Sequence, residues 1–255
     1  MFGVLIRSIF ASLISLFGLE VMLGNRRSFV WLGLALLFSL MVTAILTIRL
    51  CRPKHGFLKH ATFSLFFYAA GLLFFIFIPS RGFQQFFSFF LSIFFGLLIF
   101  YIGNFILGHT EKQKTYRHYT LFDLIILVCS FVAYSSLFGV YMLFSWPVWS
   151  LIISAFFMSL LLFYYYFWYN KITHERRNLY FLIFGLIILE ASWAMVFWPV
   201  SFLTRGIVLF TLFYVFSGML KHHHQNTLSK IIIREYVITS VILLALVLST
   251  ARWSY

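Results

Sequence analysis

The stretch "LIILEASWAMVFWPVSFLTRGIVLF" (186–210) holds two apolar runs separated by a proline and a short polar turn. Both runs continue beyond the quoted residues, and about 20 mostly apolar residues are enough for a helix to cross a hydrocarbon core of ~30 Å. Pro199 cannot continue the first helix, so we expect the chain to turn there. The pattern predicts two antiparallel membrane-spanning helices joined at one membrane surface.

The composition extends this prediction to the whole chain. Of 255 residues, 63% are hydrophobic and 10% are charged, and the mean hydropathy is +0.99. A soluble domain has roughly 25% charged residues. Strands of a membrane barrel would alternate in polarity over about 10 residues, and these apolar runs do not alternate. The sequence predicts an all-α, polytopic transmembrane helical bundle that forms one transmembrane domain over residues 1–255.

Hydropathy predicts about nine spans, separated by short polar loops. Of the 19 Lys and Arg residues, 14 fall on the side of the N-terminus if the chain crosses nine times. Because basic loops stay in the cytoplasm, this bias predicts a cytoplasmic N-terminus and an external C-terminus. We place the spans near residues 3–23, 29–48, 61–79, 83–107, 120–145, 147–169, 179–198, 202–219 and 232–251.

The basic side also indicates the partners of the chain. The net charge of +13 is explained by this orientation signal, so it does not call for a nucleic-acid partner. A basic cytoplasmic face attracts anionic lipid headgroups. We therefore expect a multi-pass protein of a cell membrane, namely a bacterial plasma membrane, in contact with the bilayer and its anionic lipids. The sequence also leaves open a second membrane protein as a partner.

The segment "FFYAAGLLFFIFIPSRGFQQFFSFF" (66–90) resembles 186–210. Each has an apolar run, a proline and then an Arg-Gly pair that opens the next run. This spacing predicts two parallel four-span repeats, residues 1–110 and 111–226, with 227–255 as an added ninth span. The alternative is that apolar helices with basic loops resemble one another by composition alone.

Glu190 is the main candidate for a functional polar site. A carboxylate inside an apolar span needs a cation, a metal or water, or else it stays protonated. Arg205, at the start of the next span, is its expected partner, and Trp193 lies one turn away on roughly the same helical face. This set is either a protonatable site in a transport path or a pair that fixes helix packing.

The run "KHHHQ" (221–225) is a weak candidate for a metal site through His222, His223 and His224. Adjacent residues of a helix point about 100° apart, so three in a row cannot all ligate one ion. No phosphate-binding, hydrolase or metalloprotease motif is found, and the sequence gives no acid–base pair for catalysis. We expect no cofactor and lean against an enzyme.

Three functions remain open from the sequence. The first is an integral membrane protein without evident catalytic chemistry, acting as a scaffold, an assembly subunit or a lipid-contacting component. The second is a small permease or flippase-like transporter that uses Glu190, although transporters usually show broken helices or several polar groups at midplane. The third is a membrane enzyme that acts on lipid-linked substrates.

Overall fold

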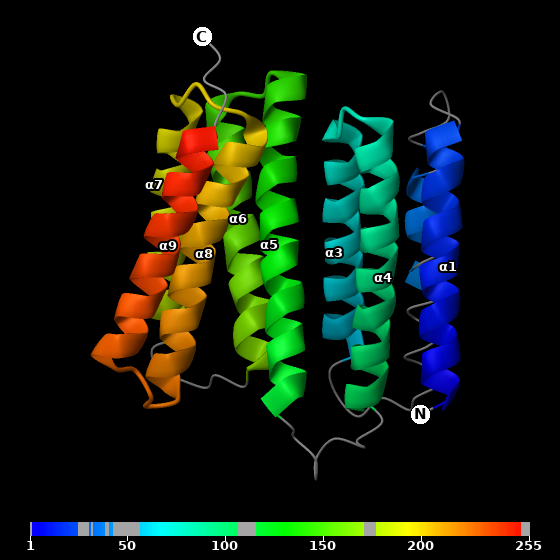
Figure 1. Ribbon diagram of the computed structural model, residues 1–255, viewed down its shortest axis with the longest axis horizontal. Coiled ribbons are helices and arrows are strands. Elements are labelled where there is room, and N and C mark those ends of the chain that lie inside the picture. Colours follow the sequence, from blue (N-terminus) through cyan, green and yellow to red (C-terminus); the bar gives the residue numbers. More distant parts are fainter. Residues whose placement is uncertain are drawn as a thin grey trace. The chain divides into compact units, whose positions relative to one another are not determined.

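The computed structural model describes residues 2–24, 31, 33–38, 41–42, 57–106, 116–170 and 177–250, and these form helices joined by short turns. Most of the predicted span 29–48 lies outside the described residues. Figure 1 shows the helices of each part of the chain running side by side. The helices are α1 (Phe2–Gly24), α3 (Phe57–Phe77), α4 (Arg81–Ile106), α5 (Tyr116–Phe144), α6 (Val148–Tyr169), α7 (Arg177–Val196), α8 (Phe202–His224) and α9 (Lys230–Thr250).

The all-helical membrane class predicted from the sequence is confirmed. Seven helices of the described part are long and apolar enough to cross a membrane, and the apolar helix Thr62–Phe77 is shorter. The turns after Phe77, Phe144 and Val196 contain Pro79, Pro147 and Pro199, and the sequence predicted the turn at Pro199. The largest difference in a boundary is that α8 continues to His224, five residues beyond its predicted end. The total of nine spans stays a prediction.

The chain divides into two compact units, Met1–Ile125 and Ile126–Tyr255. The division falls inside α5, whereas the predicted repeats meet between residues 110 and 111. Each unit is described by itself. The internal repeat stays a prediction.

In the first unit, α4 packs against both α1 and α3. Hydroxyl groups join the three helices in the buried interior: the Oγ of Ser15 is hydrogen-bonded to the Tyr68 hydroxyl at 2.9 Å and to the Oγ of Ser92 at 3.0 Å. Gly96 of α4 lies against Ser12 of α1 so closely that a Cβ would have no room. Hydrogen bonds between membrane helices contribute about 0.6 kcal/mol each on average, so these hydroxyls stabilise the packing of α1, α3 and α4.

In the second unit, α6 packs on α7, α7 on α8 and α8 on α9. The Tyr134 hydroxyl of α5 is hydrogen-bonded to the Oγ of Ser159 in α6 at 3.0 Å, and both residues are fully buried. Gly206 of α8 contacts the backbone of Ser135 in α5, and an added Cβ would lie 2.7 Å from the Ser135 Cα. Small residues allow such close approach of helix backbones in membranes.

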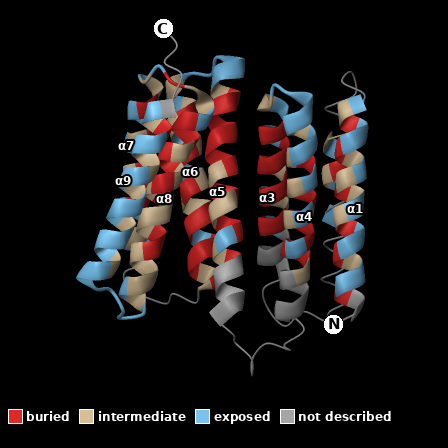
Figure 2. Ribbon diagram, in the orientation of Figure 1, coloured by how far each residue is buried: buried red, intermediate tan, exposed pale blue. Residues whose placement is uncertain are grey.

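Helix α9 is the most exposed helix of this unit. Only 6% of its membrane-spanning window is buried, against 50% for α8, and Figure 2 shows α9 largely in the colour of exposed residues. In its first half, the ring of Tyr236 lies on Gly218, and its centre is 5.1 Å from that of the Tyr214 ring. An almost fully exposed apolar helix is stable where lipid surrounds it, which agrees with the membrane class.

Candidate functional site

The turn between α7 and α8 holds a buried arginine. Ser201 caps α8, since its side chain accepts a hydrogen bond from the Thr204 backbone N–H. Arg205, in the first turn of α8, is 7% exposed, and its Nη2 donates to the carbonyl oxygen of Trp198 at 2.7 Å. Its guanidinium also lies 5.9 Å from the centre of the Phe138 ring.

The contacts of Arg205 explain why an arginine is buried at this turn. Trp198 lies just after the end of α7, where helix carbonyls lack partners within the helix and where the helix dipole favours a cation. Arg205 therefore closes the turn between the two helices. Its Nε is buried without a hydrogen-bond partner.

Glu190 lies in the middle of α7, and its side chain is exposed. Among the described residues, the side chain of Arg205 donates one hydrogen bond, to the Trp198 carbonyl, and no ion pair joins Arg205 to Glu190. The structure therefore does not bring together the expected pair. The physical reason is rotation about the helix axis: the buried face of α7 is formed by Ile188, Ser192 and Met195, and Glu190 points away from it.

Trp193 shares the exposed face of α7 with Glu190. Its side chain is 55% exposed. Its ring packs edge-on against the ring of Phe197, with 5.8 Å between the two ring centres. The two predicted site residues of α7 thus lie together on its outer surface. Arg205 lies apart from them in the interior of the unit.

The histidine run forms the last turn of α8 together with Lys221. His222 is directed toward α9: its Nδ1 is hydrogen-bonded to Thr227 Oγ1 at 3.0 Å, and its ring lies 6.0 Å from that of Tyr236. His223 lines a pocket on another side of the helix. No group of three His, Cys, Asp or Glu side chains that could hold a metal ion occurs in the part of the chain that the structure describes.

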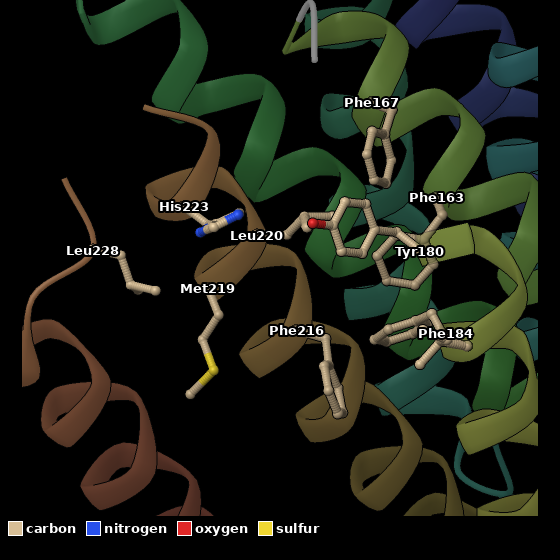
Figure 3. Close-up of a pocket in the computed structure, with 10 residues that line it drawn as sticks. Phe163, Phe167, Tyr180, Phe184, Phe216, Met219, Leu220, His223 and Leu228 are labelled. Carbon is tan, nitrogen blue, oxygen red and sulfur yellow. The ribbon is translucent and has the colours of Figure 1, made fainter. Parts of the chain in front are cut away.

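The pocket at His223 has a volume of about 410 Å³. It lies between α6, α7 and α8 at the end of the unit where α6 ends and α7 begins, which we call the basic end because α8 finishes there with Lys221 and the histidines. Figure 3 shows side chains from these helices converging on it. Its lining is apolar except for the hydroxyl group of Tyr180 and the ring nitrogens of His223: Phe163, Phe167, Tyr180, Ile183, Phe184, Phe216, Met219, Leu220, His223 and Leu228.

The pocket has the size and the character of a small-molecule site, because such sites measure about 300–1,000 Å³ and combine apolar walls with a few polar groups. Tyr180 of α7 and His223 of α8 supply these groups from facing helices (Figure 3). The rings of Phe163 and Phe184, whose centres lie 3.8 Å apart and whose planes are tilted by 56°, both belong to its lining. An apolar chain fits these walls, and a polar or anionic end group fits the basic end.

Sequence reasoning missed this pocket. Its walls are apolar residues of three helices, and a chain that is apolar almost throughout gives no signal for which of them face a cavity. His223 is the only lining residue that the sequence analysis had named as a candidate. Glu190, Trp193 and Arg205 do not line the pocket.

The length and apolar character of the described helices define a multi-pass helical membrane protein. The chain belongs to a family described as a protein of unknown function, DUF5656, whose pattern matches residues 12–250. No curated protein and no solved structure matches the chain.

Proposed function

We propose that this chain is a lipid-contacting membrane component whose second unit binds the apolar chain of an anionic lipid. The observation that carries the proposal is the pocket of about 410 Å³, apolar on its walls and bordered by His223 at the basic end. Every element that forms it is a membrane-spanning helix of the second unit or the turn after α8. A lipid chain can thus reach the pocket from within the bilayer.

The charge of the basic end favours an anionic head group. Lys221, His222, His223 and His224 lie in the last turn of α8, and α9 begins with Lys230. Basic pockets between transmembrane helices on the cytoplasmic side bind anionic head groups, and each Lys or Arg near the surface contributes about 1 kcal/mol. The proposed orientation, with the N-terminus in the cytoplasm of a bacterial cell, puts the basic end at the cytoplasmic leaflet, where the head group would contact it.

Two sources share this chemistry, a bilayer phospholipid and a polyisoprenyl phosphate. The first agrees with a scaffold, assembly or lipid-contacting role. The second agrees with an enzyme that acts on lipid-linked substrates. The permease alternative requires a carboxylate in a water-filled path, and Glu190 lies on the exposed face of α7. We therefore do not propose transport.

The test uses the purified full-length chain, stripped of lipid in mild detergent. The measurement is the thermal midpoint of unfolding with added phosphatidylglycerol, phosphatidylcholine or polyisoprenyl phosphate. A ligand that binds only the folded state at 100 times its Kd stabilises by about 2.7 kcal/mol. We expect a larger rise with the anionic lipids than with phosphatidylcholine. Comparison of the two anionic lipids separates the two sources.

Matched variants locate the binding. Met219→Trp adds bulk inside the pocket and should abolish the rise, whereas Val241→Trp, on the exposed surface of α9, should leave it unchanged. Lys221→Gln combined with His223→Gln should keep lipid binding but reduce the preference for anionic lipid. Equal behaviour of the two tryptophan variants, or no response to any lipid, would overturn the proposal.

A further inference from the structure

The pocket at His223 ends on phenylalanine rings at its deep side. Its lining includes Phe163 of α6, Phe184 of α7 and Phe216 of α8. In each helix this phenylalanine is the lining residue farthest from the basic end, because α6 and α8 finish at that end and α7 begins there. Among the described residues, none that lies deeper along these helices lines the pocket. Figure 3 shows the three rings grouped together, away from His223 and Leu228.

These rings contact one another. The ring centres of Phe163 and Phe184 lie 3.8 Å apart, and those of Phe184 and Phe216 lie 4.7 Å apart. Phe213, nearly one turn deeper in α8, is fully buried, and its ring centre lies 4.7 Å from that of Phe163 and 6.5 Å from that of Phe184. Rings whose centres lie within about 7 Å are in contact, so an apolar chain does not pass between them. We call these four residues the phenylalanine floor.

The phenylalanine floor limits the depth of the pocket. His223, at the basic end, stands seven residues after Phe216 in α8, which is about 10 Å along the helix axis at ~1.5 Å per residue. With C–C bonds of ~1.5 Å, an extended alkyl chain advances about 1.3 Å per carbon, so roughly eight carbons span ~10 Å. The apolar part of one leaflet is about 15 Å thick, which is half of a hydrocarbon core of ~30 Å. A chain that fills a leaflet is therefore longer than the pocket is deep.

We propose that the phenylalanine floor sets the length of the apolar chain that the pocket prefers. A chain of about eight carbons, with its head group at Lys221 and the histidines, reaches the floor without bending. A longer chain must bend at the floor or leave the pocket between helices, and either course loses packing contacts. The preferred ligand is an anionic amphiphile whose chain is shorter than those that fill a leaflet.

This inference rests on the proposed lipid site and specifies its ligand. Of the two sources with the same head-group chemistry, it favours an acyl chain over a polyisoprenyl chain, because the polyisoprenyl chain is far longer than the pocket is deep. The inference also gives the phenylalanine floor a role beyond the packing of α6, α7 and α8.

The experiment uses the purified full-length chain in mild detergent. The probes are lysophosphatidylglycerols whose single acyl chain grows stepwise from shorter to longer than the pocket depth, each at the same mole fraction in the micelles. The measurement is the apparent Kd from the thermal midpoint at rising probe concentration. We expect the tightest binding near the length that reaches the floor. A chain that fills a leaflet should bind at least about 5-fold more weakly, the lower end of the cost of overpacking.

Substitutions at Phe216 should move the preferred length in both directions. Phe216→Leu shortens the side chain and should shift the preference to longer chains, whereas Phe216→Trp adds bulk and should shift it to shorter ones. Phe210→Leu is the matched control, because Phe210 is also a half-buried ring of α8 but does not line the pocket. A residue that only supports packing would change the affinity for all chain lengths alike.

The outcomes separate this inference from the proposed function. Opposite shifts in the two Phe216 variants, with no shift in Phe210→Leu, would support the phenylalanine floor. Equal affinity for every chain length, or one preferred length shared by all three variants, would overturn it and leave the lipid site standing. No response to any probe would overturn both.

Discussion

The Nη2 of Arg205 donates a hydrogen bond to the carbonyl oxygen of Trp198 across 2.7 Å, within an interior where Arg205 is only 7% exposed. This bond joins the first turn of α8 to the residues that follow α7. It makes Arg205 a determinant of how the α7–α8 hairpin closes.

Arg205→Leu should destabilise the protein. The substitution leaves the Trp198 carbonyl without its donor in a poorly hydrated place, and an unsatisfied buried acceptor costs about 1–3 kcal/mol. The free energy of unfolding can be measured by titration of mixed micelles with a denaturing detergent. Arg81→Leu is the control, because Arg81 precedes the corresponding Gly82 but is exposed. The change at Arg81 should stay within about 0.5 kcal/mol.

Glu190→Leu should leave the stability of the dilute monomer unchanged within about 0.5 kcal/mol, since the side chain is exposed. An ion pair with Arg205 would predict the opposite, because removing one partner of a buried pair costs about 3–5 kcal/mol. The measurement is the same detergent titration, at a dilution where size-exclusion chromatography shows monomer. A large loss of stability in Glu190→Leu would support the ion pair between Glu190 and Arg205 that the sequence suggested.

Gly206→Ala should destabilise the second unit by about 1–3 kcal/mol, which is the usual cost of overpacking. A Cβ at Gly206 would lie 2.7 Å from the Cα and 2.8 Å from the backbone nitrogen of Ser135, so the two helices must move apart. At Gly82 the nearest atom to an added Cβ is the Ser80 Oγ at 4.0 Å, and Gly82→Ala is therefore the matched control. Thermal midpoints of the two variants should differ clearly. Similar midpoints would show that α5 and α8 can move apart without a loss of stability, which would contradict this prediction.

Ser15→Ala should cost more than Tyr68→Phe. Ser15 is hydrogen-bonded to both Tyr68 and Ser92, so its loss removes two bonds, whereas Tyr68→Phe leaves the bond between Ser15 and Ser92. Hydrogen bonds between membrane helices average about 0.6 kcal/mol each, so the two variants should differ by roughly that amount. Equilibrium unfolding of both variants in one detergent gives the order. The reverse order would contradict the geometry of the three hydroxyls.

Much of the fold could be predicted from the sequence because membrane helices are specified by length and hydropathy. The predicted span 83–107 agrees closely with α4 (Arg81–Ile106), and Pro199 lies in a turn as expected. The end of α8 was predicted too early because Lys221 and the histidines reduce hydropathy without breaking a helix. Basic residues near a helix C-terminus in fact interact favourably with its dipole.

The candidate site was harder to predict, for a physical reason. In a soluble helix the polar face marks the outside, but α7 is apolar on both its buried and its exposed faces. The sequence therefore showed that Glu190 lies in the helix but not which way its side chain points. For this reason the expected contact between Glu190 and Arg205 is not found in the structure. The pocket at His223 depends in the same way on rotations of α6, α7 and α8 that hydropathy does not encode.

The bond between Ser15 and Ser92 joins residues 77 positions apart. A ribosome that adds about 5–20 residues per second needs roughly 4–15 s to cover that distance. Helix α1 can enter the bilayer in the first part of that interval, while the α4 hydroxyl that completes its packing has not yet been synthesised. During synthesis of the first unit, α1 is therefore complete several seconds before the hydroxyl group of Ser92, its hydrogen-bond partner in α4, exists.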